Sequence, residues 1–171
     1  MLDRGIFPNT IFFNSIIVNL CKGGRVIESE NLFDLMARIG GKPDVITYST
    51  LIDGYCSAGK MDKAMKLLAG MVSVGVKPDC VMYNTLINGY CKITRMENAL
   101  ALFQEMVSNG VSPNFITYNV MLQGLFRTGR TATAKELYVQ IIKSGKKDLI
   151  EQREHLLGLL HRGRMNILHK S

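Results

Sequence analysis

One pattern recurs along the chain every 35 residues, and this repetition limits the possible folds more than any other feature. It starts at Lys42 with KPDVITYSTLIDGYC, at Lys77 with KPDCVMYNTLINGYC and at Ser112 with SPNFITYNVMLQGLF, and it extends back to PNTIFFNSIIVNLC at Pro8. A period of this length is typical of arrays in which each supersecondary unit buries its apolar face against its neighbours. We therefore expect an array of repeats rather than one globular core.

The repeats are residues 10–44, 45–79, 80–114 and 115–148, between the end of a preceding repeat at 1–9 and a degenerate partial repeat at 149–171. A one-residue deletion before Asp148 brings GLLHRGRM at 158–165 into line with GYCSAGKM of the second repeat. Apolar residues recur at helical spacing twice in each repeat, which predicts two antiparallel helices. The first helices are expected at 11–22, 46–57, 81–92 and 116–127, and the second at 26–38, 61–73, 96–108 and 131–143.

The second helix of each repeat is followed by a glycine and, in three repeats, by a proline. Glycine suits a left-handed helix C-cap, and proline stops a helix from continuing. The glycines are Gly40, Gly75, Gly110 and Gly145, and the prolines are Pro43, Pro78 and Pro113.

The composition fits a folded chain with an acidic polymer as a plausible partner. Hydrophobic residues make up 47% of the chain and the formal net charge is +7, so disorder is not expected. No apolar run approaches the roughly 18 residues of a membrane span, and no signal or transit peptide pattern opens the chain.

Cys21, Cys56 and Cys91 share one repeat position, which favours packing over a disulfide or metal site.

The pattern VxYNTLIxGYCK, followed by xxxAxxLFxxM and GxxPD or GxxPN, resembles the P-class pentatricopeptide repeat family, especially its fertility-restorer-like branch in plant organelles. The resemblance implies an all-α, right-handed superhelical solenoid that binds single-stranded RNA with one base per repeat. It also implies a role in transcript processing or stability in the mitochondrion, with the chloroplast as an alternative.

The tetratricopeptide repeat is the nearest competing family. Its usual period is 34 residues and its first helix carries a Trp, whereas this chain has a 35-residue period and no Trp. A helical scaffold that binds a protein or peptide stays open as the alternative function.

The resemblance assigns three residues of each repeat to base recognition. The second residues would sandwich bases, although periodicity alone also allows them a place in the core; they are Ile11, Ile46, Val81 and Ile116. The fifth residues would contact a base edge together with the closing residue of the repeat, although Asn and Ser are also favoured helix N-caps. These pairs are Asn14 with Asp44, Ser49 with Asp79, Asn84 with Asn114, and Asn119 with Asp148.

By the two-residue code of the family, the pairs imply the RNA core 5′-U-G-C/U-U-3′, with the amino terminus toward the 5′ end. Cations are needed for the phosphates, and the first-helix segments, each taken with the turn that follows it (10–25, 45–60, 80–95 and 115–130), contain seven basic residues and one acidic residue. Lys22, Lys92 and Arg127 are the best phosphate candidates, and Ser57 interrupts their repeat position.

No constellation of side chains predicts catalysis. Glu151, His155, His161 and His169 do not form a metal or nucleophile site, so we expect no enzyme activity, cofactor, metal or small-molecule substrate. Protein partners could bind at exposed ends of the array, because the first helix pair is expected to expose Ile16, Ile17 and Leu20.

Overall fold

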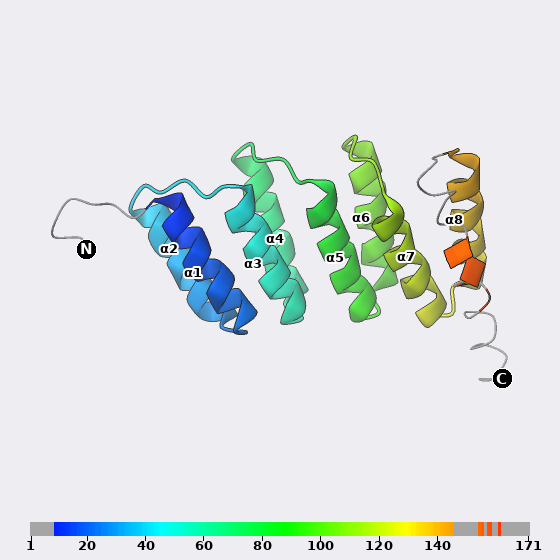
Figure 1. The fold of residues 1–171 in the computed structure, drawn as a ribbon, viewed down its shortest axis with the longest axis horizontal. Coiled ribbons are helices and arrows are strands. Elements are labelled where there is room, and N and C mark those ends of the chain that lie inside the picture. Colours follow the sequence, from blue (N-terminus) through cyan, green and yellow to red (C-terminus); the bar gives the residue numbers. More distant parts are fainter. Residues whose placement is uncertain (1–8, 146–153, 156, 159–160, 162–171) are drawn as a thin grey trace. The chain divides into compact units, whose positions relative to one another are not determined.

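The structure is a computed structural model that describes residues 9–145, 154–155, 157–158 and 161. Over these residues it contains eight α-helices of thirteen residues each and no strand (Figure 1). The helices are α1 (Thr10–Lys22), α2 (Val26–Arg38), α3 (Val45–Ser57), α4 (Met61–Ser73), α5 (Cys80–Lys92), α6 (Met96–Ser108), α7 (Phe115–Arg127) and α8 (Thr131–Lys143).

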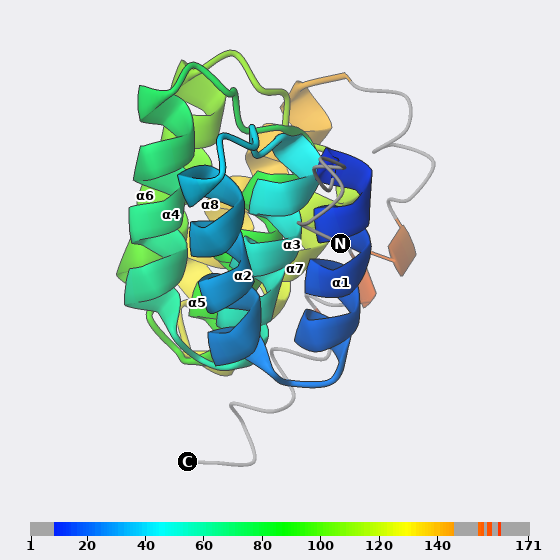
Figure 2. The ribbon, with the colours of Figure 1, turned by 90° about the vertical axis from the view of Figure 1, so that its left-hand side faces the viewer.

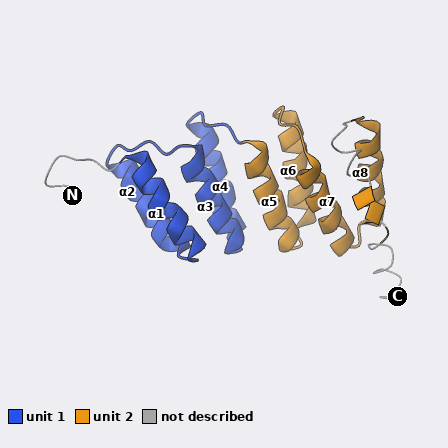
Figure 3. Cartoon of the chain, viewed as in Figure 1, with its two compact units in different colours: residues 1–78 blue, residues 79–171 orange. Residues whose placement is uncertain are grey.

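The chain forms two compact units, residues 1–78 and residues 79–171, coloured blue and orange in Figure 3. In the first unit α1 packs against α2 and α3, and α3 also packs against α4; in the second unit α5 packs against α6 and α7, and α7 against α8. Figure 2 shows α1 and α2 side by side, joined by a short loop at their lower ends. Each first helix thus packs on its own partner, and within each unit on the first helix of the neighbouring repeat.

The closing residue of each repeat starts the next first helix. Asp44 is the N-cap of α3: its side chain accepts from the backbone N–H of Thr47, and the Thr47 hydroxyl accepts from the backbone N–H of Asp44. Asn114 and Thr117 form the same reciprocal capping box at the start of α7. Because the cap is the closing residue itself, the first helices start one residue earlier than predicted, whereas the second helices have their predicted bounds.

The predicted glycine C-caps are confirmed. Each of the four glycines after a second helix has a positive φ between 65° and 83°, a conformation that costs glycine little. The turn between the two helices of a repeat also needs a positive φ, and three repeats place glycine there, namely Gly24, Gly59 and Gly129. The third repeat places Thr94 at that position with φ 60°.

The cysteines pack against glycines of the following first helix. Gly54 has no side chain and so leaves room for Cys21 Sγ, since a Cβ added at Gly54 would lie 2.9 Å from that sulfur. A Cβ added at Gly124 would lie 2.6 Å from Cys91 Sγ. Burial raises the pKa of Cys91 to about 11, so it stays a neutral thiol. Cys56 and Cys91 are buried and Cys21 is half-buried, which confirms the packing interpretation.

The expectation that Ile17 would be exposed at the end of the array is wrong. Ile17 is wholly buried, as are Ile52, Ile87 and Leu122 at the same place in the later repeats. The position is therefore buried in all four repeats, the first included. Ile16 and Leu20 are half-buried.

Candidate functional site

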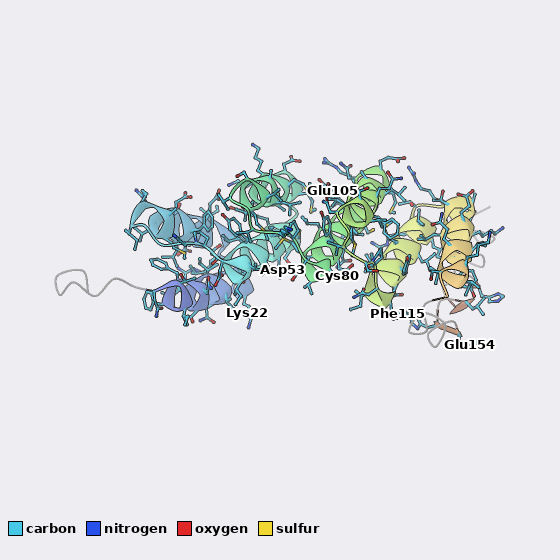
Figure 4. The ribbon with its side chains drawn as sticks, turned by 90° about the horizontal axis from the view of Figure 1, so that it is seen from above. Lys22, Asp53, Cys80, Glu105, Phe115 and Glu154 are labelled. Carbon is cyan, nitrogen blue, oxygen red and sulfur yellow. The ribbon has the colours of Figure 1, made fainter. Side chains whose placement is uncertain are left out.

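The second residue of every repeat is an exposed β-branched aliphatic side chain. The exposed fractions are 74% for Ile11, 57% for Ile46, 68% for Val81 and 56% for Ile116, so the core interpretation does not hold for them. Each lies in the first turn of a first helix. Seen from above in Figure 4, α1 and α3 lie on one side of the first unit and α2 and α4 on the other.

The fifth residue of the first repeat is hydrogen-bonded to its closing residue. Asn14 Nδ2 lies 3.0 Å from Asp44 Oδ1 and 3.3 Å from Asp44 Oδ2, and the amide oxygen of Asn14 accepts from Thr47 Oγ1 at 2.6 Å. A carboxylate has only acceptors to offer, so Asn14 must turn its Nδ2 toward Asp44. The expected joint action of this pair therefore has a direct physical basis.

The second unit contains an equivalent pair in the third repeat. Asn84 Nδ2 donates to Asn114 Oδ1 at 3.3 Å. Asn114 Oδ1 also caps the backbone N–H of Thr117, so the atom that faces Asn84 must be an acceptor. Asn114 therefore accepts a hydrogen bond from the Asn84 amide, as Asp44 does from the Asn14 amide.

The alternative that the fifth residues are N-caps is wrong. Asn14, Ser49, Asn84 and Asn119 lie inside their helices, and the caps are Asn9 and the closing residues Asp44, Asp79 and Asn114. The hydroxyl of Ser49 donates to the carbonyl of Ile46 at 3.2 Å. Asp79 is the N-cap of α5, and its side chain accepts from the backbone N–H of Met82 at 2.8 Å.

In the fourth repeat a residue that the sequence analysis missed holds the fifth residue. Gln123 Nε2 donates to Asn119 Oδ1 at 3.2 Å. A spacing of four residues on one helix face could have indicated this pair. The predicted partner Asp148 lies outside the described residues.

Hydrogen bonds keep the closing residue Asp44 ionised. Burial alone would raise the pKa of its carboxyl group, but the hydrogen bonds from the Thr47 backbone N–H and the Asn14 amide outweigh burial and hold the pKa below its usual value. Asp44 is therefore a negatively charged acceptor at neutral pH.

The predicted phosphate-binding cations Lys22, Lys92 and Arg127 are exposed and end the helices α1, α5 and α7. Figure 4 labels Lys22 on α1. Arg127 Nη1 also donates to the carbonyl of Cys91 at 3.4 Å. By contrast, Arg25 is ion-paired with Glu28 and Arg130 with Glu97, so these two basic residues of the first-helix segments already have acidic partners.

One residue of the partial repeat contacts the first residue of α7. The His155 ring contacts the Phe115 ring edge-on, with centroids 5.6 Å apart, and both His155 and His161 are exposed. Glu151 and His169 lie outside the described residues.

Among the described residues no three His, Cys, Asp or Glu side chains gather as a metal site, and no helix is long and apolar enough to span a membrane.

Family models of the PPR repeat match most of the chain. One matches residues 4–37 and 39–72, another residues 116–145, and a model of the PPR repeat family matches residues 78–127. No curated protein sequence matches the chain.

Solved structures with the same fold include the pentatricopeptide repeat protein PPR10 from maize, which is 28% identical with a TM-score of 0.79 over 98% of this chain. A complex of PPR10 with an 18-nucleotide psaJ RNA element is 32% identical with a TM-score of 0.73 over 93% of this chain. The chain spans 25% of the PPR10 chain in each case.

The PPR domain of the protein-only RNase P 1 of Arabidopsis thaliana, in complex with tRNA, is 14% identical with a TM-score of 0.69; the match covers 91% of this chain and 84% of that one. At this identity the similarity shows the fold alone. Together with the helices of the described residues, these matches make the fold an all-α helical solenoid.

Proposed function

Because the chain belongs to the pentatricopeptide repeat family, we propose that it binds single-stranded RNA through its first helices and performs no chemistry of its own. PPR10, which is 32% identical over 93% of this chain, has been solved in complex with RNA. The chain spans a quarter of PPR10, so the activity of a whole protein is part of the proposal.

The pairing of the fifth residue with the closing residue carries the proposal. In each of the two compact units, two polar side chains that lie 30 residues apart in the sequence form a hydrogen bond. The pairs are Asn14 with Asp44 and Asn84 with Asn114. An amide that donates one N–H within the protein still has a second N–H donor that can bind a base edge. The same arrangement in both units supports one mode of recognition per repeat.

An exposed aliphatic side chain accompanies each of these amides. Ile11 precedes Asn14 by three residues, and Val81 precedes Asn84 by three, so each pair shares a helix face. An apolar side chain beside a hydrogen-bonding amide suits a base, whose faces are apolar and whose edges are polar. The exposed cations Lys22 and Lys92 at the far ends of these helices support contacts to phosphate.

The base order proposed for the four repeats is 5′-U-G-C/U-U-3′, with the amino terminus toward the 5′ end. Four bases give little specificity, because only four positions can discriminate and each mismatch costs only about 1–3 kcal/mol in comparable DNA-binding proteins. Within a longer array, these repeats would contribute to the processing or stability of an organellar transcript, in the mitochondrion by family resemblance.

Selection of bound RNA from a random pool tests the proposal without assuming a sequence. We expect enrichment of U-G-C/U-U cores. Enrichment of an unrelated core would overturn the proposed base order, and recovery of no RNA above a bead control would overturn RNA binding itself and favour a scaffold for proteins.

A further inference from the structure

The hydroxyl group of Thr47 contacts both partners of the recognition pair in the first repeat. Thr47 belongs to the second repeat and is wholly buried. Its Oγ1 lies 2.6 Å from Asn14 Oδ1. The same oxygen accepts from the backbone N–H of Asp44 at 3.1 Å and lies 2.9 Å from Asp44 Oδ1. One buried side chain therefore connects Asn14, its closing residue and the next helix.

A hydroxyl has one hydrogen, so Thr47 can donate to only one of these two acceptors. Asp44 Oδ1 already accepts from Asn14 Nδ2 and from the Thr47 backbone N–H, and Asn14 Oδ1 is the nearer acceptor. The hydroxyl hydrogen is thus best placed on Asn14 Oδ1. The Asn14 amide then has its oxygen and one N–H hydrogen bound within the protein.

The third repeat lacks this contact although its residues are nearly the same. Thr117 occupies the place of Thr47 and forms the same capping box with Asn114, but its hydroxyl donates to Asn114 Oδ1 at 3.1 Å and not to Asn84. The amide oxygen of Asn84 is buried without a hydrogen-bond partner among the described residues. A single 3.3 Å hydrogen bond to the neutral Asn114 and a weak contact to the Cys80 sulfur hold this amide.

We infer that Thr47 is a positioning residue for base recognition, which sharpens the selectivity of the first repeat by locking the Asn14 amide. The inference rests on the proposed function. With its oxygen bound to Thr47 and one N–H bound to Asp44, Asn14 offers the base a single fixed donor. A fixed donor suits the O4 acceptor of uracil and opposes the N4 amino donor of cytosine at the same place.

The less constrained amide of Asn84 can adjust to either pyrimidine. Rotation of the Asn14 amide breaks hydrogen bonds to two residues, one of them the charged Asp44, whereas rotation of the Asn84 amide breaks one 3.3 Å hydrogen bond to the neutral Asn114 and a weak contact to the Cys80 sulfur. A site that is held in its bound geometry discriminates better than one that can reorient. Thr47 thus separates a selective repeat from a tolerant one.

The test compares Thr47→Val with Thr117→Val, because both substitutions keep side-chain shape and remove the same capping-box hydroxyl. Binding of 5′-UGCU-3′ and 5′-CGCU-3′ RNA is measured by fluorescence anisotropy with the whole chain. Thr47→Val should lower the preference for uracil at the first base by about fivefold, the effect of one neutral hydrogen bond. Thr47→Ser should restore it, and Thr117→Val should leave it unchanged.

A measurement without RNA separates this inference from the proposed function. The side-chain amide protons of Asn14 are followed by NMR, and Thr47→Val should shift them and speed their exchange with water, while Thr117→Val leaves those of Asn14 unchanged. An Asn14 amide that does not respond to Thr47→Val would overturn the inference whatever the RNA result. A responding amide with an unchanged base preference would also overturn it, and a wild-type chain that binds no RNA would contradict the proposed function alone.

Discussion

At the scale of single residues, Ser49 offers the clearest change of base preference. It carries the one hydroxyl among the fifth residues of the four repeats, and the resemblance pairs it with Asp79 for guanine. Ser49→Asn gives the second repeat the same pair as the first, so preference at the second base should move from guanine to uracil while overall affinity holds. Anisotropy with 5′-UGCU-3′ and 5′-UUCU-3′ RNA, for both proteins at one salt concentration, measures the change.

An unchanged ranking of the two RNAs after Ser49→Asn would show that the assignment of bases to repeats is wrong. Ser49 is half-buried and donates only to a carbonyl of its own helix, so its replacement should leave the thermal midpoint nearly unaltered.

Val81 tests the proposed sandwich of bases. Its side chain is 68% exposed, so Val81→Asp should leave helicity intact yet weaken every RNA by a similar factor, of the order of tenfold for about 1 kcal/mol or more of stacking. The matched control is Val107→Asp, a similarly exposed valine, 51%, on the second helix α6. Equal binding by the wild type and Val81→Asp proteins would remove Val81 from the RNA-binding face.

The sequence predicted the two pairs that the structure shows hydrogen-bonded, in the first and third repeats, but not how their hydrogen bonds are arranged. Asn14 with Asp44 followed from the family pattern, and the structure adds that the amide oxygen is taken up by Thr47, 33 residues away in the chain. Thr117 stands in the same sequence context and makes a different bond. Such differences depend on tertiary placement, which the repeat pattern does not determine.

At the scale of the elements, Thr94 strains the turn between α5 and α6. A β-branched residue with φ 60° is disfavoured, and glycine stands at this turn in the other three repeats. Thr94→Gly should therefore raise the free energy of unfolding by about 1 kcal/mol, after the larger entropy of an unfolded glycine is subtracted. Urea denaturation followed by circular dichroism measures it, and a lower midpoint would contradict the strain.

The contact between α5 and α7 depends on Gly124. An added Cβ would lie 2.6 Å from Cys91 Sγ and 2.8 Å from Met96 Sδ, so Gly124→Ala should destabilise the chain by about 1–3 kcal/mol despite the better helix propensity of Ala. Adding Cys91→Ala should recover part of that loss, because it removes one of the two sulfur contacts. A double variant no more stable than Gly124→Ala alone would place the clash elsewhere.

Helix positions were predictable because their signals are local. The second helices match their predicted bounds, and the first helices start one residue early because Asp44, Asp79 and Asn114 act as caps. The burial of Ile17 contradicts the expectation of an exposed end, because the same position is wholly buried in all four repeats.

At the scale of the whole molecule, the charge balance favours RNA. The net charge is +7, and the first-helix segments hold seven basic residues and one acidic residue. If Lys22, Lys92 and Arg127 each contact one phosphate, the logarithm of the binding constant should fall against the logarithm of salt concentration with a slope of about −2. Replacing all three by Gln should flatten this slope and weaken all RNAs alike.

The most direct test of sequence-selective RNA binding is the affinity of the whole chain for 5′-UGCU-3′-containing RNA and for poly-A of the same length, measured by anisotropy at several salt concentrations. Both affinities should fall with salt along parallel lines, because the phosphate contacts are shared, and the UGCU RNA should bind more tightly at every concentration. Equal affinities for the two RNAs would contradict base recognition by these repeats.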